Sequence, residues 1–365
     1  MHYNFKVDKD IKKAETLPSK FYMDESIFDL VKRKIFSKSW QWIGHENLVK
    51  QPNSIYPISL MNNFLDEPIL LTKDNNGIIS CLSNVCTHRG NLLALTPAKT
   101  KKLVCMYHGR RFNLNGDFEF MPEFEKTKNF PRDCDNLFNF PIEKWGPFLF
   151  MGIDPQYDLK KVIEKINNRV GFLPLNEFSL REDLGKDYIV DANWALYCDN
   201  YLEGFHIPFV HEGLTQNLNY ADYNTELFKY SNLQIGVGKN DVDCFTLPQE
   251  SVDFGKKIAA YYFWLFPNMM FNFYPWGLSI NIVMPMGPEK TKVKFLSYIW
   301  DKSKLNTGAG AELDKVEQED EEIVEQVQKG VKSRFYDRGH FSPSMEQGVH
   351  HFHLLLSEFL TINPD

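Results

Sequence analysis

Two pairs of potential metal ligands constrain this chain more than any other feature. Cys86-x-His88 is followed, after sixteen intervening residues, by Cys105-x-x-His108, and a glycine follows each pair. Glycines allow two tight loops to approach a bound group closely. Two thiolates and two imidazoles suit a [2Fe–2S] cluster in which the cysteines hold one iron and the histidines the other. A Cys₂His₂ zinc site is the alternative, but its usual spacing places Cys with Cys and His with His.

A second group of potential ligands lies in the otherwise apolar and aromatic residues 199–211. It contains Asp199, Glu203, His206 and His211. Glu203 and His206 are three residues apart, so on a helix they share a face. Pro208 is expected to end or turn that helix, which allows His211 to swing back. Two neutral imidazoles and one carboxylate form the facial triad of non-heme Fe(II) sites, so we predict a mononuclear iron centre here.

The third ligand of this centre is predicted from a distant helix, residues 312–333. At about 100° per residue, Asp320 falls in the middle of its apolar stripe, whereas four neighbouring glutamates point elsewhere. A buried carboxylate must be paired or bound to a metal. We therefore favour Asp320 as the third ligand, and an aspartate salt-bridged in the core is the alternative. The stripe consists of Leu313, Val316, Ile323, Val324 and Val327, and the four glutamates are Glu319, Glu321, Glu322 and Glu325.

Composition excludes several classes of protein. The net charge of −7 argues against nucleic-acid binding. We expect no membrane span, because no apolar run approaches about eighteen residues, and the N-terminus shows no apolar core of a secretory signal. We therefore expect a cytoplasmic protein without a disulfide framework. The cysteines outside the first ligand group are expected to be buried core thiols: Cys81, Cys134, Cys198 and Cys244.

The pattern of apolar, polar and turn-forming residues along the chain predicts three parts. Residues 1–39 are predicted to be an arm and a helix (24–37, with Asp24 near its N-cap) that pack with the last part. Residues 40–155 read as a small all-β domain with a hairpin turn at 74–77. In residues 156–365, four apolar strands precede a long helix, which predicts an α+β domain with an antiparallel sheet. The expected strands are 261–266, 269–274, 279–284 and 293–300, and the other expected helices are 159–170 and 350–359.

The first ligand group is the motif of the Rieske family. Rieske proteins of respiratory chains resemble it but add two disulfide-forming cysteines, whose positions are occupied here by Asn91 and Tyr107. The resemblance is therefore to the lower-potential, oxygenase-type Rieske domain. It extends over residues 40–359 and is to Rieske non-heme iron oxygenase alpha subunits (the aromatic-ring-hydroxylating dioxygenase family). The choline monooxygenase and glycine betaine monooxygenase group is similar at 193–194, 198–202, 266–268, 285–288 and 350–353.

The resemblance implies a helix-grip catalytic domain, an antiparallel sheet covered by a long helix. It also implies a homotrimer in which Glu203 bridges to a Rieske histidine of the neighbouring subunit. Many members have Asp there, so Glu203 is a departure that some amine-oxidising members share; Asp199 is the fallback for this role. Asn200 is expected beside the iron without ligating it. Tyr201, Phe205 and Phe209 are expected to be core aromatics.

These features predict the terminal oxygenase of a multicomponent system. A separate NAD(P)H-dependent flavin/iron–sulfur reductase would supply electrons, because the chain has no Gly-x-Gly-x-x-Gly fingerprint. With O₂, the enzyme would hydroxylate or N-demethylate a small molecule, most simply a quaternary ammonium compound such as choline or a betaine held by cation–π contacts. The candidate rings, which would equally serve as core, are Phe263, Trp264, Phe271, Phe273, Tyr274 and Trp276.

Two alternatives stay open. One is ring hydroxylation of an aromatic acid. The other, from a different class, is a Rieske electron carrier or binding protein without mononuclear iron. That reading leaves the second ligand group and some 200 residues around it unexplained.

Overall fold

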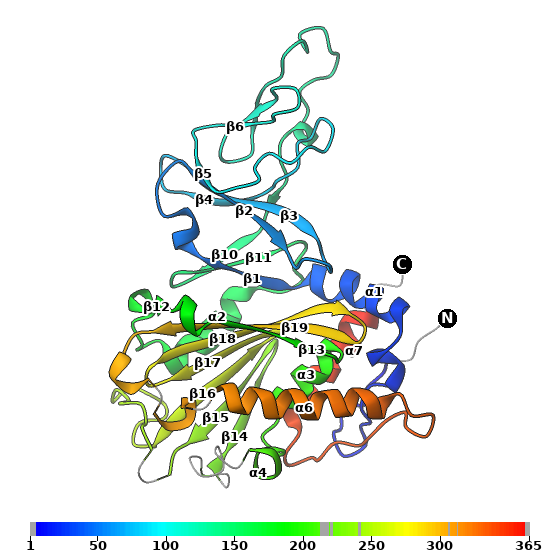
Figure 1. Cartoon of the computed structure of the whole chain (residues 1–365), viewed down its shortest axis with the longest axis vertical. Coiled ribbons are helices and arrows are strands. Elements are labelled where there is room, and N and C mark those ends of the chain that lie inside the picture. The colour runs from blue at the N-terminus through cyan, green and yellow to red at the C-terminus, as the bar shows by residue number, and fades with distance from the viewer. Residues whose placement is uncertain are drawn as a thin grey trace. The chain divides into compact units, whose positions relative to one another are not determined.

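The computed structural model describes residues 5–211, 219, 222–239, 242–305, 307–311 and 313–361. The chain divides into two compact units, one formed by Met1–Phe36 with Asp158–Asp365 and the other by Ser37–Tyr157 (Figure 1). The smaller unit is built from β-strands and the larger one from a sheet and helices, which is the predicted α+β class.

Small antiparallel sheets make up the unit Ser37–Tyr157. The predicted hairpin is present: β3 and β4 pair, and Asp74 at the turn accepts hydrogen bonds from the backbone N–H groups of Asn76 and Ile78. The strands are β1 (Trp40–His45), β2 (Ser54–Leu60), β3 (Glu67–Lys73), β4 (Ile79–Ser83), β5 (Ala98–Lys99), β6 (Leu103–Val104), β7 (Arg111–Phe112), β8 (Phe118–Phe120), β9 (Asn139–Phe140), β10 (Ile142–Trp145) and β11 (Phe148–Gly152).

An eight-stranded antiparallel sheet forms the centre of the larger unit, in the order β12-β19-β18-β17-β16-β15-β14, with β13 also paired to β19. All four predicted strands are present as β16 to β19, whereas β12, β13, β14 and β15 were not predicted. The strands are β12 (Ser179–Leu180), β13 (Lys186–Val190), β14 (Asn224–Phe228), β15 (Ser231–Val237), β16 (Ile258–Leu265), β17 (Met269–Tyr274), β18 (Gly277–Gly287) and β19 (Lys290–Ile299).

Helices pack against this sheet, and α6 crosses one of its faces (Figure 1). The predicted cap of α1 is confirmed, because the Asp24 carboxylate accepts hydrogen bonds from the backbone N–H groups of Ser26 and Ile27. Across the described residues, no helix is both long and apolar enough to cross a membrane. The helices are α1 (Glu25–Lys34), α2 (Leu159–Val170), α3 (Trp194–Tyr201), α4 (Ile207–Val210), α6 (Leu313–Val331) and α7 (Gln347–Thr361).

The buried face of α6 differs from the predicted apolar stripe. Val327 is 43% exposed, and the fully buried positions include Glu317 and Gln328. Both polar side chains have partners in the interior: Glu317 accepts from the Tyr197 hydroxyl, and Gln328 accepts from the backbone N–H of Asn193. The prediction that an apolar stripe including Val327 forms the buried face of α6 was therefore wrong, because hydrogen-bonded polar side chains occupy part of that face.

α7 packs closely against the end of α3, just before Glu203. A Cβ at Gly348, the second residue of α7, would lie 2.1 Å from the Leu202 carbonyl oxygen. We expect Gly348→Ala to destabilise the fold by about 1–3 kcal/mol, because neither backbone can yield. Gly330→Ala on α6 is the matched control, since a Cβ there meets nothing within 4 Å. Thermal unfolding should show a lower Tm for the first variant only; equal values would contradict this contact.

Candidate metal centres and substrate pocket

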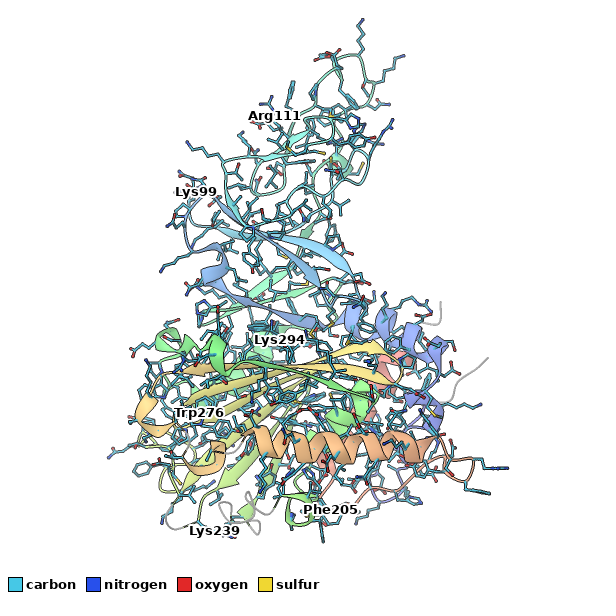
Figure 2. The ribbon with its side chains drawn as sticks, viewed as in Figure 1. Lys99, Arg111, Phe205, Lys239, Trp276 and Lys294 are labelled. Carbon is cyan, nitrogen blue, oxygen red and sulfur yellow. The ribbon has the colours of Figure 1, made fainter. Side chains whose placement is uncertain are left out.

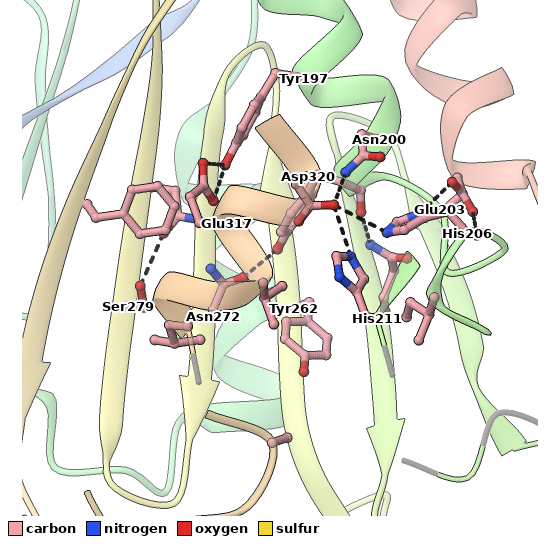
Figure 3. A pocket seen from close by; sticks show the side chains of 18 of the residues that line it. Tyr197, Asn200, Glu203, His206, His211, Tyr262, Asn272, Ser279, Glu317 and Asp320 are labelled. Atoms are coloured by element: carbon pink, nitrogen blue, oxygen red, sulfur yellow. Dashed lines mark hydrogen bonds and ion pairs between the residues drawn. The ribbon is translucent and has the colours of Figure 1, made fainter. Parts of the chain in front are cut away.

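The structure brings together the three ligands predicted for the second centre. His206, His211 and Asp320 each offer an atom within 4.8 Å of the others (Figure 3). The Nε2 atoms of His206 and His211 lie 3.6 Å and 3.0 Å from Oδ1 of Asp320. Two imidazoles and one carboxylate at this separation fit a divalent iron, and each histidine directs the same ring nitrogen at the centre of the group.

The local backbone around these histidines differs from the prediction. α3 ends at Tyr201, so Glu203 and His206 lie in the segment after the helix rather than on one helical face. Pro208 does not end a helix; it lies in the first turn of the short α4, where its missing N–H costs nothing. α4 then carries the chain from His206 to His211, and the ring centroids of these two histidines are 5.1 Å apart.

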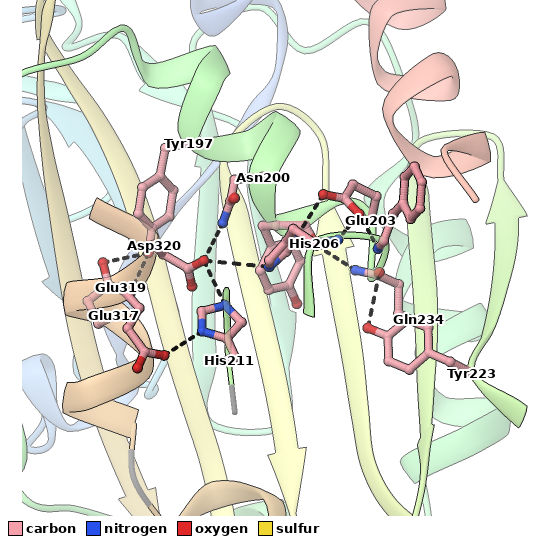
Figure 4. A network of polar contacts seen from close by, with 12 residues as sticks. Tyr197, Asn200, Glu203, His206, His211, Tyr223, Gln234, Glu317, Glu319 and Asp320 are labelled. Carbon is pink, nitrogen blue, oxygen red and sulfur yellow. Dashed lines mark hydrogen bonds and ion pairs between the residues drawn. The ribbon is translucent and has the colours of Figure 1, made fainter. Parts of the chain in front are cut away.

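Each histidine is held through its other ring nitrogen. Nδ1 of His206 lies 2.6 Å from Oε1 of Glu203, and Nδ1 of His211 lies 2.7 Å from Oε2 of Glu319 (Figure 4). A carboxylate that binds Nδ1–H leaves Nε2 unprotonated and orients the ring for a metal. The expectation that Glu319 points away from this site was wrong, since its long side chain reaches the ring of His211.

The shared carboxylate of Asp320 has a third partner, because Nδ2 of Asn200 donates to its Oδ1 at 2.6 Å. Asn200 thus lies beside the centre, where it was expected. Burial alone would lower the pKa of His211, but the hydrogen bonds and charges of Asp320 and Glu319 raise it above its ordinary value.

Asp199 has a different environment from that of Glu203. Its Oδ1 lies 2.9 Å from Nε2 of His353, and its Oδ2 accepts from the Tyr22 hydroxyl at 3.3 Å. Nδ1 of His353 accepts from the backbone N–H of Leu17, so the proton of this ring faces Asp199. These contacts tie α3 to α7 and to the N-terminal segment.

A pocket of about 800 Å³, counting its open mouth, lies against the three clustered ligands. It lies between α6 and α3 on one side and the strands β15 to β19 on the other (Figure 3). Its floor includes a row of directly paired strand positions with polar side chains: Gln234, Tyr262, Asn272 and Ser279.

Polar side chains are tolerated at this partly buried floor because tyrosine hydroxyls donate hydrogen bonds to its amide oxygens. Oδ1 of Asn272 accepts from the Tyr201 hydroxyl at 2.7 Å, and Oε1 of Gln234 accepts from the Tyr223 hydroxyl at 3.1 Å. Sequence reasoning missed this floor, although amides inside otherwise apolar strands are an available signal. Tyr201 also lines the pocket, so the expectation of a purely core aromatic was incomplete.

Most of the rings proposed as substrate contacts are core residues. Among the six, Tyr274 lines the pocket, and Trp276 stacks on it with centroids 5.1 Å apart. Trp264 instead packs against Phe352 of α7 in the interior. The aromatic lining of the pocket consists of Tyr197, Tyr201, Tyr223, Tyr262, Tyr274 and Phe295.

Glu317 is the unexpected member of the lining. Only 4% of it is exposed, and both of its carboxylate oxygens lie within 2.8 Å of the Tyr197 hydroxyl oxygen (Figure 4). Burial, followed by the charge of Asp320, raises the pKa of Glu317 well above its ordinary value. Sequence analysis did not consider this residue.

The first ligand group lies on two similar loops of the smaller unit. In each, the glycine four residues after the cysteine has a positive φ (72° at Gly90 and 73° at Gly109) and donates its N–H to the cysteine carbonyl. Cys86 and Cys105 are buried, and the rings of His88 and His108 lie 4.8 Å apart. The two loops thus bring the two imidazoles together and place the two thiols within hydrogen-bonding reach of each other.

The surroundings of these donors suit a bound cluster. Burial alone would raise the pKa of Cys105, but hydrogen bonds from the Tyr107 backbone N–H, the Cys86 thiol, the His108 backbone N–H and the Asn91 amide lower it, whereas burial raises the pKa of Cys86. Burial and the neighbouring His108 lower the pKa of His88, which favours the neutral ring that binds metals. Asn91 lies 3.7 Å from the Cys105 sulfur. All six cysteines are free thiols in the structure.

Two expectations for side-chain burial in these regions were wrong. Cys134 is exposed rather than a core thiol, and Cys244 is only partly buried. Phe205 (Figure 2) is 41% exposed instead of lying in the core, and Phe209 is 81% exposed. The backbone N–H of Phe205 donates to Glu203, and the rings of Phe205 and Phe209 lie with their centroids 6.3 Å apart on the surface of the larger unit.

Comparison with known families agrees with this geometry. Residues 39–131 match the Rieske [2Fe-2S] domain, and residues 177–361 match the ring hydroxylating alpha subunit (catalytic domain). The chain is 30% identical to the chloroplastic choline monooxygenase of Arabidopsis thaliana over 96% of its own length and 84% of that protein. The chain belongs to the Rieske oxygenase alpha-subunit family.

Another relative of this Rieske oxygenase is the carnitine monooxygenase oxygenase subunit of Escherichia coli (strain K12). It is 27% identical over 95% of this chain and 94% of that protein. Among solved structures, the quaternary ammonium Rieske monooxygenase CntA in complex with L-carnitine has the same fold, with a TM-score of 0.75 at 23% identity, covering 98% of this chain and 99% of that one. Naphthalene 1,2-dioxygenase with bound indole also has this fold, with a TM-score of 0.72 at 16% identity over 99% and 95% of the chains.

Membership of the family establishes the cofactors and the general activity. This Rieske oxygenase is an oxidoreductase that carries a [2Fe–2S] cluster and a mononuclear iron. The two donor groups described above fit these cofactors in number and type: Cys₂His₂ on paired loops for the cluster, and His₂ with one carboxylate for the single iron.

Proposed function

We propose that this Rieske oxygenase is the terminal component of a multicomponent monooxygenase that acts on a quaternary ammonium compound. In this proposal, residues 40–155 hold the cluster through Cys86, His88, Cys105 and His108. Residues 156–365, with the arm 1–39, hold the mononuclear iron through His206, His211 and Asp320. The convergence of the last three side chains at an aromatic pocket carries the proposal.

The chain's own residues prepare the iron site for O₂ chemistry. Iron, when bound, supplies the activation of O₂, and the cluster supplies electrons singly. Glu203 and Glu319 orient the two imidazoles, and Asn200 fixes the Asp320 carboxylate. The pocket holds the substrate beside the open side of this triad, where an N-methyl or other C–H bond would be hydroxylated. Hydroxylation of an N-methyl carbon leaves an unstable hemiaminal and thus an N-demethylated product.

The lining of the pocket favours a cation over the aromatic acid considered as the alternative. Tyrosine rings line it, and such rings attract quaternary ammonium groups. None of the described residues that line it is a lysine or arginine that would pair with an aromatic carboxylate. The two relatives named above act on choline and carnitine according to their names, which agrees with this choice.

We infer that electrons come from a separate NAD(P)H-dependent reductase and pass between subunits of a homotrimer through Glu203. Exposed apolar side chains support the docking of a second copy. Met106 and Tyr107 beside His108 are 86% and 57% exposed. Phe205, two residues after Glu203, is exposed together with Phe209, and their ring centroids lie 6.3 Å apart. The cytoplasmic location belongs to the same proposal, since free thiols suit a reducing compartment.

Iron content and isotope incorporation test this function. We expect about three irons per chain, two in the cluster and one mononuclear. With a surrogate reductase and ¹⁸O₂, a panel of quaternary amines and aromatic acids should give an ¹⁸O-labelled product or a demethylated amine. About two irons per chain and no consumption of any substrate would instead support a Rieske electron carrier or binding protein.

A further inference from the structure

Glu317 brings a buried carboxyl group to the wall of the substrate pocket, where a bound cation would favour its charged form. It is buried, it lines the pocket, and within the described part of the chain no lysine, arginine or histidine forms an ion pair with it. The charged groups that act on it are the carboxylates of Asp314, Asp320 and Glu321, which all repel a negative charge. Burying such a group is costly unless a cation compensates it.

We propose that Glu317 is the counter-ion for the positive charge of the substrate, so that the pocket selects cations without a carboxylate over zwitterions. This inference rests on the proposed function, because it names the subset of quaternary ammonium compounds that the site takes. It assigns choline-like alcohols and simple alkylammonium ions to the pocket, and it disfavours betaine-like substrates.

Tyr197 holds the carboxylate in place without neutralising it. Its hydroxyl lies 2.8 Å from Oε1 and 2.7 Å from Oε2 of Glu317, so a single donor serves both oxygens. Each carboxylate oxygen can accept more than one hydrogen bond, and the remaining capacity is available to a ligand. Tyr197 comes from α3 and Glu317 from α6, and both line the pocket, so the pair is fixed by the packing of these two helices.

Rings facing the same space complete a site for an organic cation. Tyr262 and Tyr274 pack edge to face with centroids 5.9 Å apart, and both line the pocket with Tyr197. Aromatic faces with one acidic group attract an alkylated ammonium, which offers no N–H for a directional hydrogen bond. The side chains of the pocket floor (Gln234, Asn272, Ser279) are uncharged and add no second carboxylate or cation to the site.

The same lining explains the discrimination against zwitterions. A substrate carboxylate would enter a pocket that already contains Glu317 and Asp320, and no described lining residue is a lysine or arginine. Desolvating that carboxylate without a cationic partner would be unfavourable. A bound iron neutralises the Asp320 side of the pocket, but Glu317 is not among the three residues whose ligand atoms cluster.

The test compares ligands that differ only in charge. Calorimetry under argon, on the iron-loaded protein, would measure the binding of choline, glycine betaine and 3,3-dimethyl-1-butanol, the neutral carbon isostere of choline. We expect the protein to bind choline at least about tenfold more tightly than either of the other two. Glu317→Gln should weaken choline binding by about tenfold or more and change the binding of the neutral isostere by less than about twofold.

Glu322→Gln is the matched control, because it removes one charge from the exposed face of the same helix. Its binding of all three ligands should equal that of the unmodified protein. Glu317→Gln should unfold at an equal or higher temperature, because the variant buries no charge. Tyr197→Phe provides a second test, since it keeps the carboxylate and should keep the preference for choline over the neutral isostere.

Three results would overturn the role of Glu317: glycine betaine bound as tightly as choline, unchanged choline binding in Glu317→Gln, or loss of iron from that variant. The last would show that the carboxylate balances the metal rather than the substrate. None of these results touches the oxygenase proposal, which depends on iron content and on ¹⁸O incorporation.

Discussion

Replacing His206 with alanine is expected to abolish turnover while the visible spectrum of the Rieske cluster stays unchanged. The variant removes one of the three side chains that converge at the pocket, and the remaining His211 and Asp320 leave the iron weakly held. Iron should fall from about three to about two per chain. Product formation should fall below about 1% of the normal rate, since even the loss of a group that only supports a ligand costs 10–100-fold.

The control for this variant is His340→Ala, which removes an exposed imidazole from the same unit. It should retain three irons and normal turnover. Absorption and electron paramagnetic resonance of the reduced cluster would verify that the smaller unit is intact in both variants. If His206→Ala kept both its third iron and its activity, the assignment of the mononuclear site would be wrong.

The side chains of each proposed donor group could be grouped from the sequence because most of them lie close together in the chain. The spacing of Cys86, His88, Cys105 and His108 predicts that the four side chains lie on two short loops. The structure shows in addition that Gly90 and Gly109 form the turn in each loop with a positive φ. Asp320 is more than a hundred residues from His211 in the sequence, yet it was found because a carboxylate within an apolar stripe needs a partner.

The groups that support these donors could not be predicted in the same way. Glu319 was excluded by its angle on the helix, but a long side chain extends beyond the face from which it starts, and it contacts His211. Glu317 and Gln328 were overlooked because helical periodicity was read from apolar residues alone. Glu317 is buried against Tyr197 of α3, and Gln328 against Asn193, the residue before α3. These contacts join segments far apart in the chain, so the sequence pattern of α6 alone gives no sign of them.

Strand prediction failed for a related reason. β16 to β19 are mostly buried and apolar, and all four were found. β13 and β14 expose much of their surface, and β15 is buried but carries polar side chains, so these strands were missed. The polar floor of the pocket runs across β15 to β18 through paired residues. Only the register of the sheet places those residues side by side, so the substrate pocket had to come from the structure.

Glu203→Gln is expected to slow electron transfer from the cluster to the mononuclear iron by roughly 10–100-fold without loss of either metal. In the structure, Glu203 bonds Nδ1 of His206 through one oxygen and accepts the His206 backbone N–H with the other. In the proposed trimer this carboxylate also contacts a Rieske histidine of the neighbouring subunit. Glutamine keeps the length of the side chain but has only one accepting oxygen, so it cannot maintain all of these contacts.

Glu319→Gln separates the two possible roles of Glu203, because Glu319 supports His211 in the same way and is not the residue assigned to the contact between subunits. Rapid mixing of the reduced, iron-loaded, substrate-bound enzyme with O₂ would follow oxidation of the cluster in a single turnover. If Glu203 only orients its histidine, both variants should bind iron less tightly and oxidise the cluster at similar rates. If Glu203 carries the electron path, its variant alone should be slow when fully loaded with iron, and normal coupled turnover in that variant would remove the bridging role.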